Sequence, residues 1–238
     1  MRSKTTSLIF SLMISIMIAG CSTMSNKDPL EGLNRGVYKF NDVADKAVFK
    51  PVAGAYKAVT PTPVRTGVNN FFSNLNTFVT TVNQVLQFKF AKAAESAGRF
   101  VINSTVGVLG FIDVASKDGI KMHDEDFGQT LAHWGMGSGP YLVLPFVGPS
   151  TVRDTGGLIV DLFAFNPIGY VDNPRTRNGL LVAKFIDKRA ELLPGSDLLD
   201  EAALDPYAFM RDAYFQRREH QIKDGVGVSS NDDFEPAD

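Results

Sequence analysis

Residues Thr66 to Phe88 read TGVNNFFSNLNTFVTTVNQVLQF, and none of these 23 positions is Asp, Glu, Lys or Arg. We predict that Val68 to Phe88 forms one helix. The tract carries five asparagines, so it is too polar to be a good membrane-crossing helix. A long, uncharged helix that is rich in amide side chains is therefore the first feature of the predicted fold.

Other parts of the chain also lack charge. Phe100 to Ile112 and Leu162 to Val171 are uncharged, and Phe127 to Val152 has only His133 as a group that titrates near neutral pH. The last third of the chain is rich in charge. Two interpretations stay open at this point. One is a soluble helical core with long neutral loops, and the other is a body partly sunk into a membrane with an amphipathic inside.

The N-terminus is typical of a bacterial lipoprotein precursor. Two basic residues precede an apolar segment, Leu8 to Ile18, that is too short to span a bilayer. It ends in Ile18-Ala19-Gly20-Cys21, a lipobox, and Cys21 is the only cysteine. We expect residues 1–20 to be a signal peptide and Cys21 to carry a diacylglyceryl group and an N-linked acyl chain. An ordinary signal peptide with an incidental cysteine is the alternative.

The expected lipid anchor favours the membrane-sunk interpretation. Each buried methylene contributes about 0.8 kcal/mol, so three acyl chains bind far more firmly than one. Ser22 follows the cysteine, where inner-membrane retention usually requires aspartate. We therefore expect residues 21–27 to be a lipidated linker and the protein to reach the outer membrane of a diderm bacterium.

The charge balance argues against nucleic acid as a partner. Loss of the signal peptide reduces Lys and Arg from 24 to 22 against 26 Asp and Glu, so the formal charge changes from −2 to −4. A nucleic-acid-binding protein would need a basic face. The mature chain has no second cysteine, so no intramolecular disulfide stabilises it.

The motifs do not indicate an enzyme. In GMGSGP (Gly135 to Pro140), methionine stands where a serine hydrolase has the first glycine of Gly-x-Ser-x-Gly, and the pattern of a dinucleotide-binding loop also fails. HDED (His123 to Asp126) clusters possible metal ligands, but four consecutive residues cannot all face one ion on a helix. A solvated charged turn at a helix start is favoured. We expect no catalytic residue, metal site or cofactor.

Helix signals predict an all-α protein with a single domain at residues 28–222. Asp28-Pro29 supplies a cap residue and a proline for a first helix that would run to about Lys50, before Pro51. The other expected elements are a connection at Val59–Gly67, helices at Val68–Phe88, Lys92–Asn103 and Thr176–Leu193, a stop at Pro194-Gly195, and a last helix opened by Asp205-Pro206 with Tyr207, Met210 and Tyr214 on one stripe. Residues 223–238 are expected to form a disordered acidic tail.

Four segments carry a resemblance to a known family. They are DPLEGLNRGVYKFND (Asp28 to Asp42), GFIDVA (Gly110 to Ala115), DFGQTLAHWGMGSGPYLVLPFVGPSTVRDTGG (Asp126 to Gly157) and DPYAFMRDAYFQRR (Asp205 to Arg218). Together they resemble the MlaA (VacJ) family of outer-membrane lipoproteins, in the order that the family has them. The resemblance covers most of the chain from about Asp28 to Ile222.

The resemblance implies a fold and a function. It implies a helical ring within the inner leaflet of the outer membrane, with a central amphipathic channel. The channel would take phospholipids misplaced in the outer leaflet and pass them to a periplasmic lipid carrier of the MlaC type. The ring would associate with trimeric porins of the OmpC/OmpF type. The transported phospholipid would be the only ligand.

Candidate residues for this function lie in three places. We predict that Phe40 and Asn41 contact the channel mouth, although packing and a side-chain cap explain them equally well. The run of Gly135, Gly137, Gly139 and Pro140 either lines the lipid path, where glycine lets the backbone turn tightly or approach a ligand, or forms a structural loop. Arg153 and Asp154 are expected to form a structural ion pair, or to meet a head group.

The C-terminal helix is rich in charged residues. Arg211, Arg217, Arg218 and Glu219 would form a solvated helix end, or would face the periplasm or the carrier. A structural lipoprotein that organises porins is the main alternative function. An envelope enzyme that modifies lipids is a weaker one.

Overall fold

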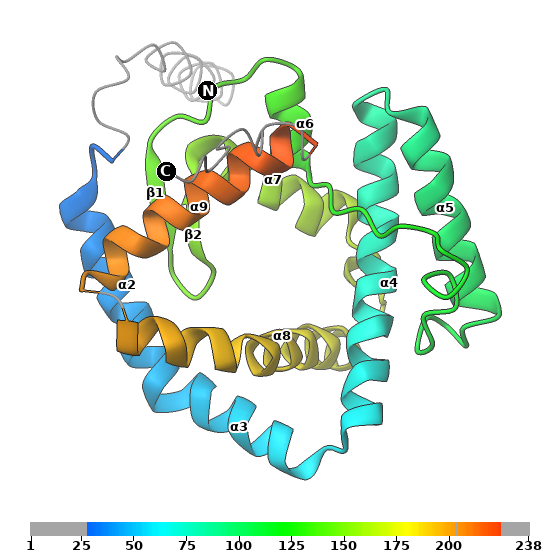
Figure 1. The fold of residues 1–238 in the computed structure, drawn as a ribbon, viewed down its shortest axis with the longest axis horizontal. Helices are drawn as coiled ribbons and strands as arrows, with labels where there is room; N and C mark the ends of the chain where they lie inside the picture. The colour runs from blue at the N-terminus through cyan, green and yellow to red at the C-terminus, as the bar shows by residue number, and fades with distance from the viewer. Residues whose placement is uncertain (1–27, 203, 225–238) are drawn as a thin grey trace, which may run out of the picture.

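The computed structural model describes residues 28–202 and 204–224. The expected signal peptide, the lipidation site Cys21, the linker 21–27 and most of the expected acidic tail lie outside the described residues. The helices follow one another around a common centre when the molecule is viewed down its shortest axis (Figure 1). The expected all-α architecture is confirmed as a mostly helical fold, to which one short β-hairpin is added.

The first half of the chain forms the left, lower and right sides of this arrangement (Figure 1). The elements are α2 (Glu31–Ala44), the π-helical turn η1 (Asp45–Phe49), α3 (Lys50–Val59), α4 (Thr62–Leu86) and α5 (Phe90–Thr105), which packs along α4.

The second half of the chain contains the short β-hairpin and the remaining helices. Its elements are α6 (Phe127–His133), strands β1 (Tyr141–Leu144) and β2 (Gly148–Thr151), α7 (Val152–Val160), the π-helical turn η2 (Asp161–Phe165), the 3-10 turn η3 (Pro167–Tyr170), α8 (Pro174–Ala202) and α9 (Pro206–Ile222). α8 packs against α3, and α9 packs against α6 and β2. Among the described residues, none of the helices combines the length and hydropathy that crossing a membrane requires.

We expected the first helix to end before Pro51. Instead, the helical structure continues from α2 through η1 into α3. At this turn the Lys50 backbone N–H donates to the Asp45 carbonyl five residues earlier. Proline has no N–H, and its ring clashes with the carbonyl four residues before it. A widened turn just before the proline relieves that clash. The helix also begins later than expected, at Glu31, with Leu30 rather than Asp28 at its cap position.

The predicted long helix is confirmed, but it begins inside the expected connection Val59–Gly67. α4 starts at Thr62 because Pro63, in its first turn, has a backbone angle suited to a helix. The Arg65 guanidinium then bridges the break, donating to the Lys57 carbonyl at 2.6 Å and to the Thr60 carbonyl at 2.9 Å. Three residues separate α4 from α5, and Phe88 among them has a φ of 60°.

The predicted helix stop at Pro194-Gly195 is wrong. α8 continues through Pro194 to Ala202. One lost backbone hydrogen bond is offset here by packing, since Ala190 and Leu193 are buried against Ala53 and Tyr56 of α3.

The β-hairpin was not predicted. β1 and β2 are antiparallel, with Tyr141 opposite Thr151 and Leu144 opposite Gly148. Tyr141 and Val143 are buried against Tyr207 of α9. Asn34 of α2 fixes the other edge: its amide donates to the Tyr141 carbonyl at 3.0 Å and accepts from the Val143 N–H at 2.9 Å. A four-residue strand flanked by Pro140 and Pro145 gives little periodic signal in the sequence.

Candidate functional site

Polar side chains fill the interior of this protein and apolar side chains cover much of its surface. Among the described residues, 21 polar or charged residues are buried against 11 apolar ones, whereas 34 large apolar residues are exposed. Exposed examples occur on most elements and include Phe40 of α2, Val59 of α3, Val101 of α5 and Phe163 of η2. A water-soluble monomer exposes only small apolar patches. The distribution therefore indicates a surface made to contact lipid or other proteins.

The buried polar groups are connected to one another between α4 and α6. Thr130 donates to the Asn83 amide oxygen at 2.8 Å, and Gln87 donates to Thr130 at 3.1 Å. Gln87 also donates to the Glu125 carboxylate at 3.0 Å. The Lys89 ammonium forms an ion pair with the same carboxylate, also at 3.0 Å. These hydrogen bonds offset the cost of burying the side chains. The amides that make the α4 tract too polar for a bilayer thus hold the helices together from within.

Asp161, at the start of η2, extends this polar chain. Its carboxylate accepts hydrogen bonds from the Phe127 N–H at 2.8 Å and from the Asn83 amide at 3.0 Å. Burial nevertheless raises the pKa of Asp161 to about 6.

This raised pKa predicts a pH dependence of stability. The folded chain binds the Asp161 proton more tightly than the unfolded chain, in which the pKa is about 3.9. The protonated Asp161 side chain therefore adds its full contribution to the stability of the fold below about pH 4, and this contribution is lost as the pH rises through about 6. We subtract the free energy of unfolding of Asp161→Asn from that of the natural protein, both measured with denaturant. This difference should decrease as the pH is raised from about 4 to about 6. Asp172→Asn, at an exposed position, is the control variant, and an equal slope for both variants would contradict the assignment.

The expected ion pair of Arg153 and Asp154 is present, at 2.9 Å, and belongs to a larger buried network. Arg218 of α9 also binds Asp154 at 2.9 Å, and it binds Asp126 at 2.5 Å. The Tyr214 hydroxyl donates to Asp154 at 2.5 Å. Burial alone would raise the pKa of Asp154, but the hydrogen bonds from both arginines and Tyr214 lower it to about 2.

The network is assembled at the starts of two helices. Asp126 caps α6 by accepting from the Gln129 N–H at 2.9 Å, and Thr151 caps α7 by accepting from the Asp154 N–H at 3.2 Å. Gly128 and Gly157 lie where the two helices touch, so closely that a Cβ on Gly157 would stand 2.3 Å from the Gly128 nitrogen. The two helix starts and their carboxylates are thereby held side by side.

The predicted glycine loop lies beside Arg153. The Ser138 carbonyl accepts from the Arg153 N–H at 3.1 Å, and the Met136 carbonyl accepts from its guanidinium at 3.4 Å. Gly135 and Gly139 have φ angles of 90° and 66°, which only glycine adopts easily. The structure thus brings the glycine loop and the ion pair together, and the role of either in a lipid path stays a prediction.

Gly137 differs from the other two glycines of this loop. It is exposed, its φ lies outside the left-handed region, and a Cβ there would meet nothing within 4 Å. Neither backbone conformation nor close packing therefore requires glycine at this position. The Pro140 carbonyl, at the end of the loop, accepts from the Val152 N–H at 3.1 Å and ties the loop to the start of α7. Contact of Gly137 or Pro140 with lipid stays a prediction.

Phe40 and Asn41 lie apart from that network, at the turn of the hairpin. The Asn41 amide donates to the Leu144 carbonyl at 2.9 Å and accepts from the Phe146 N–H at 2.8 Å. The Phe40 and Phe146 rings pack edge to face, 5.3 Å apart. These contacts are the packing and capping that stood as the alternative, and contact with a channel mouth stays a prediction.

Sequence reasoning missed the role of Arg218, the residue that joins the two carboxylates Asp126 and Asp154. Arg218 was expected at a solvated helix end, yet its side chain is only 11% exposed. Glu125, expected in a solvated turn, is buried, whereas Asp126 does open a helix as expected. The arginine-rich pattern of the last helix held no sign of burial, because the acidic partners of Arg218 lie 92 and 64 residues earlier.

The fold and the site define a helical protein with an apolar exterior and a hydrogen-bonded polar interior. Residues 26–221 match the family model described as MlaA lipoprotein. The chain belongs to the MlaA lipoprotein family, as the four motifs indicated.

Individual relatives support this membership over nearly full length. The intermembrane phospholipid transport system lipoprotein MlaA of Escherichia coli (strain K12) is 38% identical over 212 residues, which cover 87% of this chain and 83% of the relative. The protein of the same name from Haemophilus influenzae is 32% identical, covering 96% and 95% of the two chains. A solved chain from work on the structural basis for maintenance of bacterial outer membrane lipid asymmetry has a TM-score of 0.71 and 38% identity, and the match covers 82% of this chain and 98% of that one.

Proposed function

We propose that this protein is an outer-membrane lipoprotein that removes misplaced phospholipids from the outer leaflet and passes them to a periplasmic lipid carrier. The observation that carries the proposal is the distribution of its side chains, apolar outside and polar inside. A body of this kind rests among acyl chains while it offers a polar route to a head group. The names of the relatives, which concern intermembrane phospholipid transport and lipid asymmetry, point the same way.

The proposal includes the anchor, the partners and the route. Cys21 carries the diacylglyceryl group and an N-linked acyl chain, which hold the protein at the inner leaflet. A trimeric porin of the OmpC/OmpF type and a soluble carrier of the MlaC type are its partners. The glycine loop, through Ser138, and the Arg153–Asp154 pair lie at a cavity of about 210 Å³ that Tyr214 and Phe215 also line. This cavity adjoins the proposed route.

Two other functions make different predictions. A structural lipoprotein that only organises porins needs no lipid path, so phospholipid would not be isolated with it. An enzyme that modifies lipids would change the acyl composition of bound lipid during incubation. Transport without chemistry requires only that head group and tails meet different surfaces, and the buried polar interior supports that requirement.

The decisive test measures phospholipid at the surface of cells that lack the gene. Deletion should raise the amount of phospholipid in the outer leaflet, and the intact gene should restore it. A gene with Cys21→Ala should not, because the chain would lack the acyl anchor that we expect to hold it at the outer membrane. A gene with Ser22→Ala, which keeps the lipobox, serves as the control and should restore the normal level. An unchanged outer leaflet after deletion would favour the structural role.

A further inference from the structure

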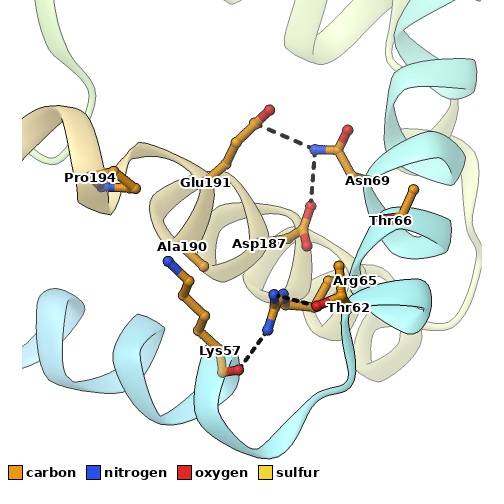
Figure 2. A pocket seen from close by; sticks show the side chains of 9 residues that line it. All are labelled: Lys57, Thr62, Arg65, Thr66, Asn69, Asp187, Ala190, Glu191 and Pro194. Atoms are coloured by element: carbon orange, nitrogen blue, oxygen red, sulfur yellow. Dashed lines mark hydrogen bonds between the residues drawn. The ribbon is translucent and has the colours of Figure 1, made fainter.

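A pocket of about 310 Å³, lined mainly by polar and charged residues, lies between α3, α4 and α8, in a part of the molecule that none of the four family motifs reaches. Figure 2 shows its side chains converging from the end of α3, the first turns of α4 and the middle of α8. The charged and amide side chains that line it are Lys57, Arg65, Asn69, Asp187 and Glu191. A volume near 300 Å³ is at the lower limit of ligand-binding pockets, and it suits a small polar group.

One side of the pocket carries a buried carboxylate whose hydrogen-bond donors in the described part of the chain are neutral. Asp187 is 6% exposed, and it accepts from the Tyr56 hydroxyl at 2.9 Å and the Asn69 amide at 3.4 Å. Within residues 28–202 and 204–224, no ion pair involves it. A buried charge without a counter-ion is unfavourable. Burial and the hydrogen bond to Asp187 raise the pKa of Tyr56 to about 12, so this phenol stays a neutral donor.

A second carboxylate, on Glu191, lies one helical turn further along α8. It accepts from the same Asn69 amide at 3.4 Å and pairs with Lys188 on the outside at 2.9 Å. Figure 2 shows Asn69 between the two carboxylates. This side of the pocket is therefore suited to a cation that can donate hydrogen bonds to Asp187.

The opposite side of the pocket is cationic. Arg65 is held there by the carbonyls that end α3, at 2.6 and 2.9 Å. The Lys57 ammonium forms no hydrogen bond or ion pair with the described part of the chain. A ligand that fits both sides has a negative group near Lys57 and Arg65 and a positive group near Asp187.

We propose that this pocket binds a phosphoethanolamine head group. The phosphate would lie against Lys57 and Arg65, and the primary ammonium would donate to Asp187 and Glu191. A phosphoglycerol head group supplies the phosphate but no cation, so it leaves Asp187 unpaired. The assignment rests on the proposed function, which makes phospholipid the cargo, and it adds that the protein distinguishes head groups.

The test compares lipids bound to the purified full-length protein in mild detergent. An equimolar mixture of phosphatidylethanolamine and phosphatidylglycerol is added, and each bound lipid is counted by native mass spectrometry. We expect the natural protein to bind more phosphatidylethanolamine. Asp187→Asn should reduce the ratio of the two lipids by about five- to tenfold, the effect of losing a charge-assisted hydrogen bond. Lys57→Gln should reduce both lipids and leave their ratio unchanged.

Matched controls are available at exposed positions. Asp172→Asn and Lys117→Gln make the same chemical changes outside the pocket, and they should alter neither ratio nor amount. If Asp187→Asn does not fold, Glu191→Gln should still lower the ratio. Glycerophosphoethanolamine, but not glycerophosphoglycerol, should then displace bound lipid from the natural protein, which shows that the head group itself is recognised.

The outcomes separate this inference from the proposed function. If the natural protein binds neither lipid, the transport function fails. If it binds both equally, or if folded Asp187→Asn keeps the original ratio, the head-group assignment fails while transport stands. Displacement by glycerophosphoethanolamine without any preference between the intact lipids would show a site for soluble phosphoethanolamine only, which would also overturn the assignment.

Discussion

Replacing Arg218 by alanine should lower the free energy of unfolding by about 3 kcal/mol. Its guanidinium binds Asp126 at 2.5 Å and Asp154 at 2.9 Å, and removal of one partner from a buried ionic network leaves uncompensated charge. Arg153 still pairs Asp154 in the variant, and the Asp126 side chain, which is 39% exposed, can be hydrated, so the cost lies at the lower end of the usual range. Denaturant unfolding in mild detergent, followed by the fluorescence of Trp134, measures it.

The neighbouring arginine provides a matched control. The Arg217 side chain is 75% exposed, and its nearest carboxylate oxygen, on Asp124, is 3.9 Å away. Arg217→Ala should change the stability by no more than about 0.5 kcal/mol. The loss of stability in Arg218→Lys should lie between those of the two alanine variants. Lysine restores the positive charge, but it lacks the planar guanidinium whose nitrogens reach two carboxylates at once. Equal effects of the two alanine variants would show that burial of Arg218 contributes nothing to stability.

Replacing Gly157 by alanine should cost about 2–3 kcal/mol and disturb the packing of α6 on α7. The added Cβ would lie 2.3 Å from the Gly128 nitrogen and 2.6 Å from its Cα. These are backbone atoms, so no side chain can rotate away, and the two helices must separate. Their separation also moves Asp126 and Asp154 relative to Arg218, so near-ultraviolet circular dichroism should change together with the unfolding midpoint.

Gly156, one residue earlier on α7, tests whether the effect is steric. A Cβ on Gly156 would meet nothing within 4 Å, so Gly156→Ala should be neutral or stabilise α7 by up to about 1 kcal/mol through helix propensity. The two variants share a helix and a chemical change and differ only in the face that they alter. A similar loss in both would mean that α7 itself, not its contact with α6, is sensitive.

Local signals predicted the elements that local physics decides. The helix predicted at Val68–Phe88 is confirmed as α4 up to Leu86, two residues short of the predicted end, and the helix at Lys92–Asn103 is confirmed within α5. Asp205 caps α9 as expected, accepting from the Ala208 N–H at 3.2 Å. The stripe of Tyr207, Met210 and Tyr214 does pack together, against β1. Capping and helical periodicity act within a few residues, so they can be recognised along the chain.

Proline effects were the weakest of these local predictions. Pro51 and Pro194 both lie within helical structure, although proline is the strongest helix-breaking residue. A π-turn relieves the first, and burial of Ala190 and Leu193 on α3 offsets the second. The residues next to a proline do not indicate whether another helix packs there and buries its neighbours.

Glycine spacing was equally ambiguous along the chain. Gly135, Gly137 and Gly139 look alike in the sequence, yet only the first and the last have positive φ angles. The path of the loop between α6 and β1 decides which of them must be glycine, and that path depends on the distant contact with Arg153.

The sequence by itself determined the family, the helical class and the unusual distribution of charge, because motifs, caps and uncharged tracts are properties of short segments. Only the tertiary structure decided which polar groups meet. Asp28 accepts from the Tyr207 hydroxyl 179 residues away, and Arg218 reaches Asp126 and Asp154 from the last helix. The same side chains in solvent would be ordinary surface charges. Burial makes them stabilising or costly according to their partners, and only the fold chooses those partners.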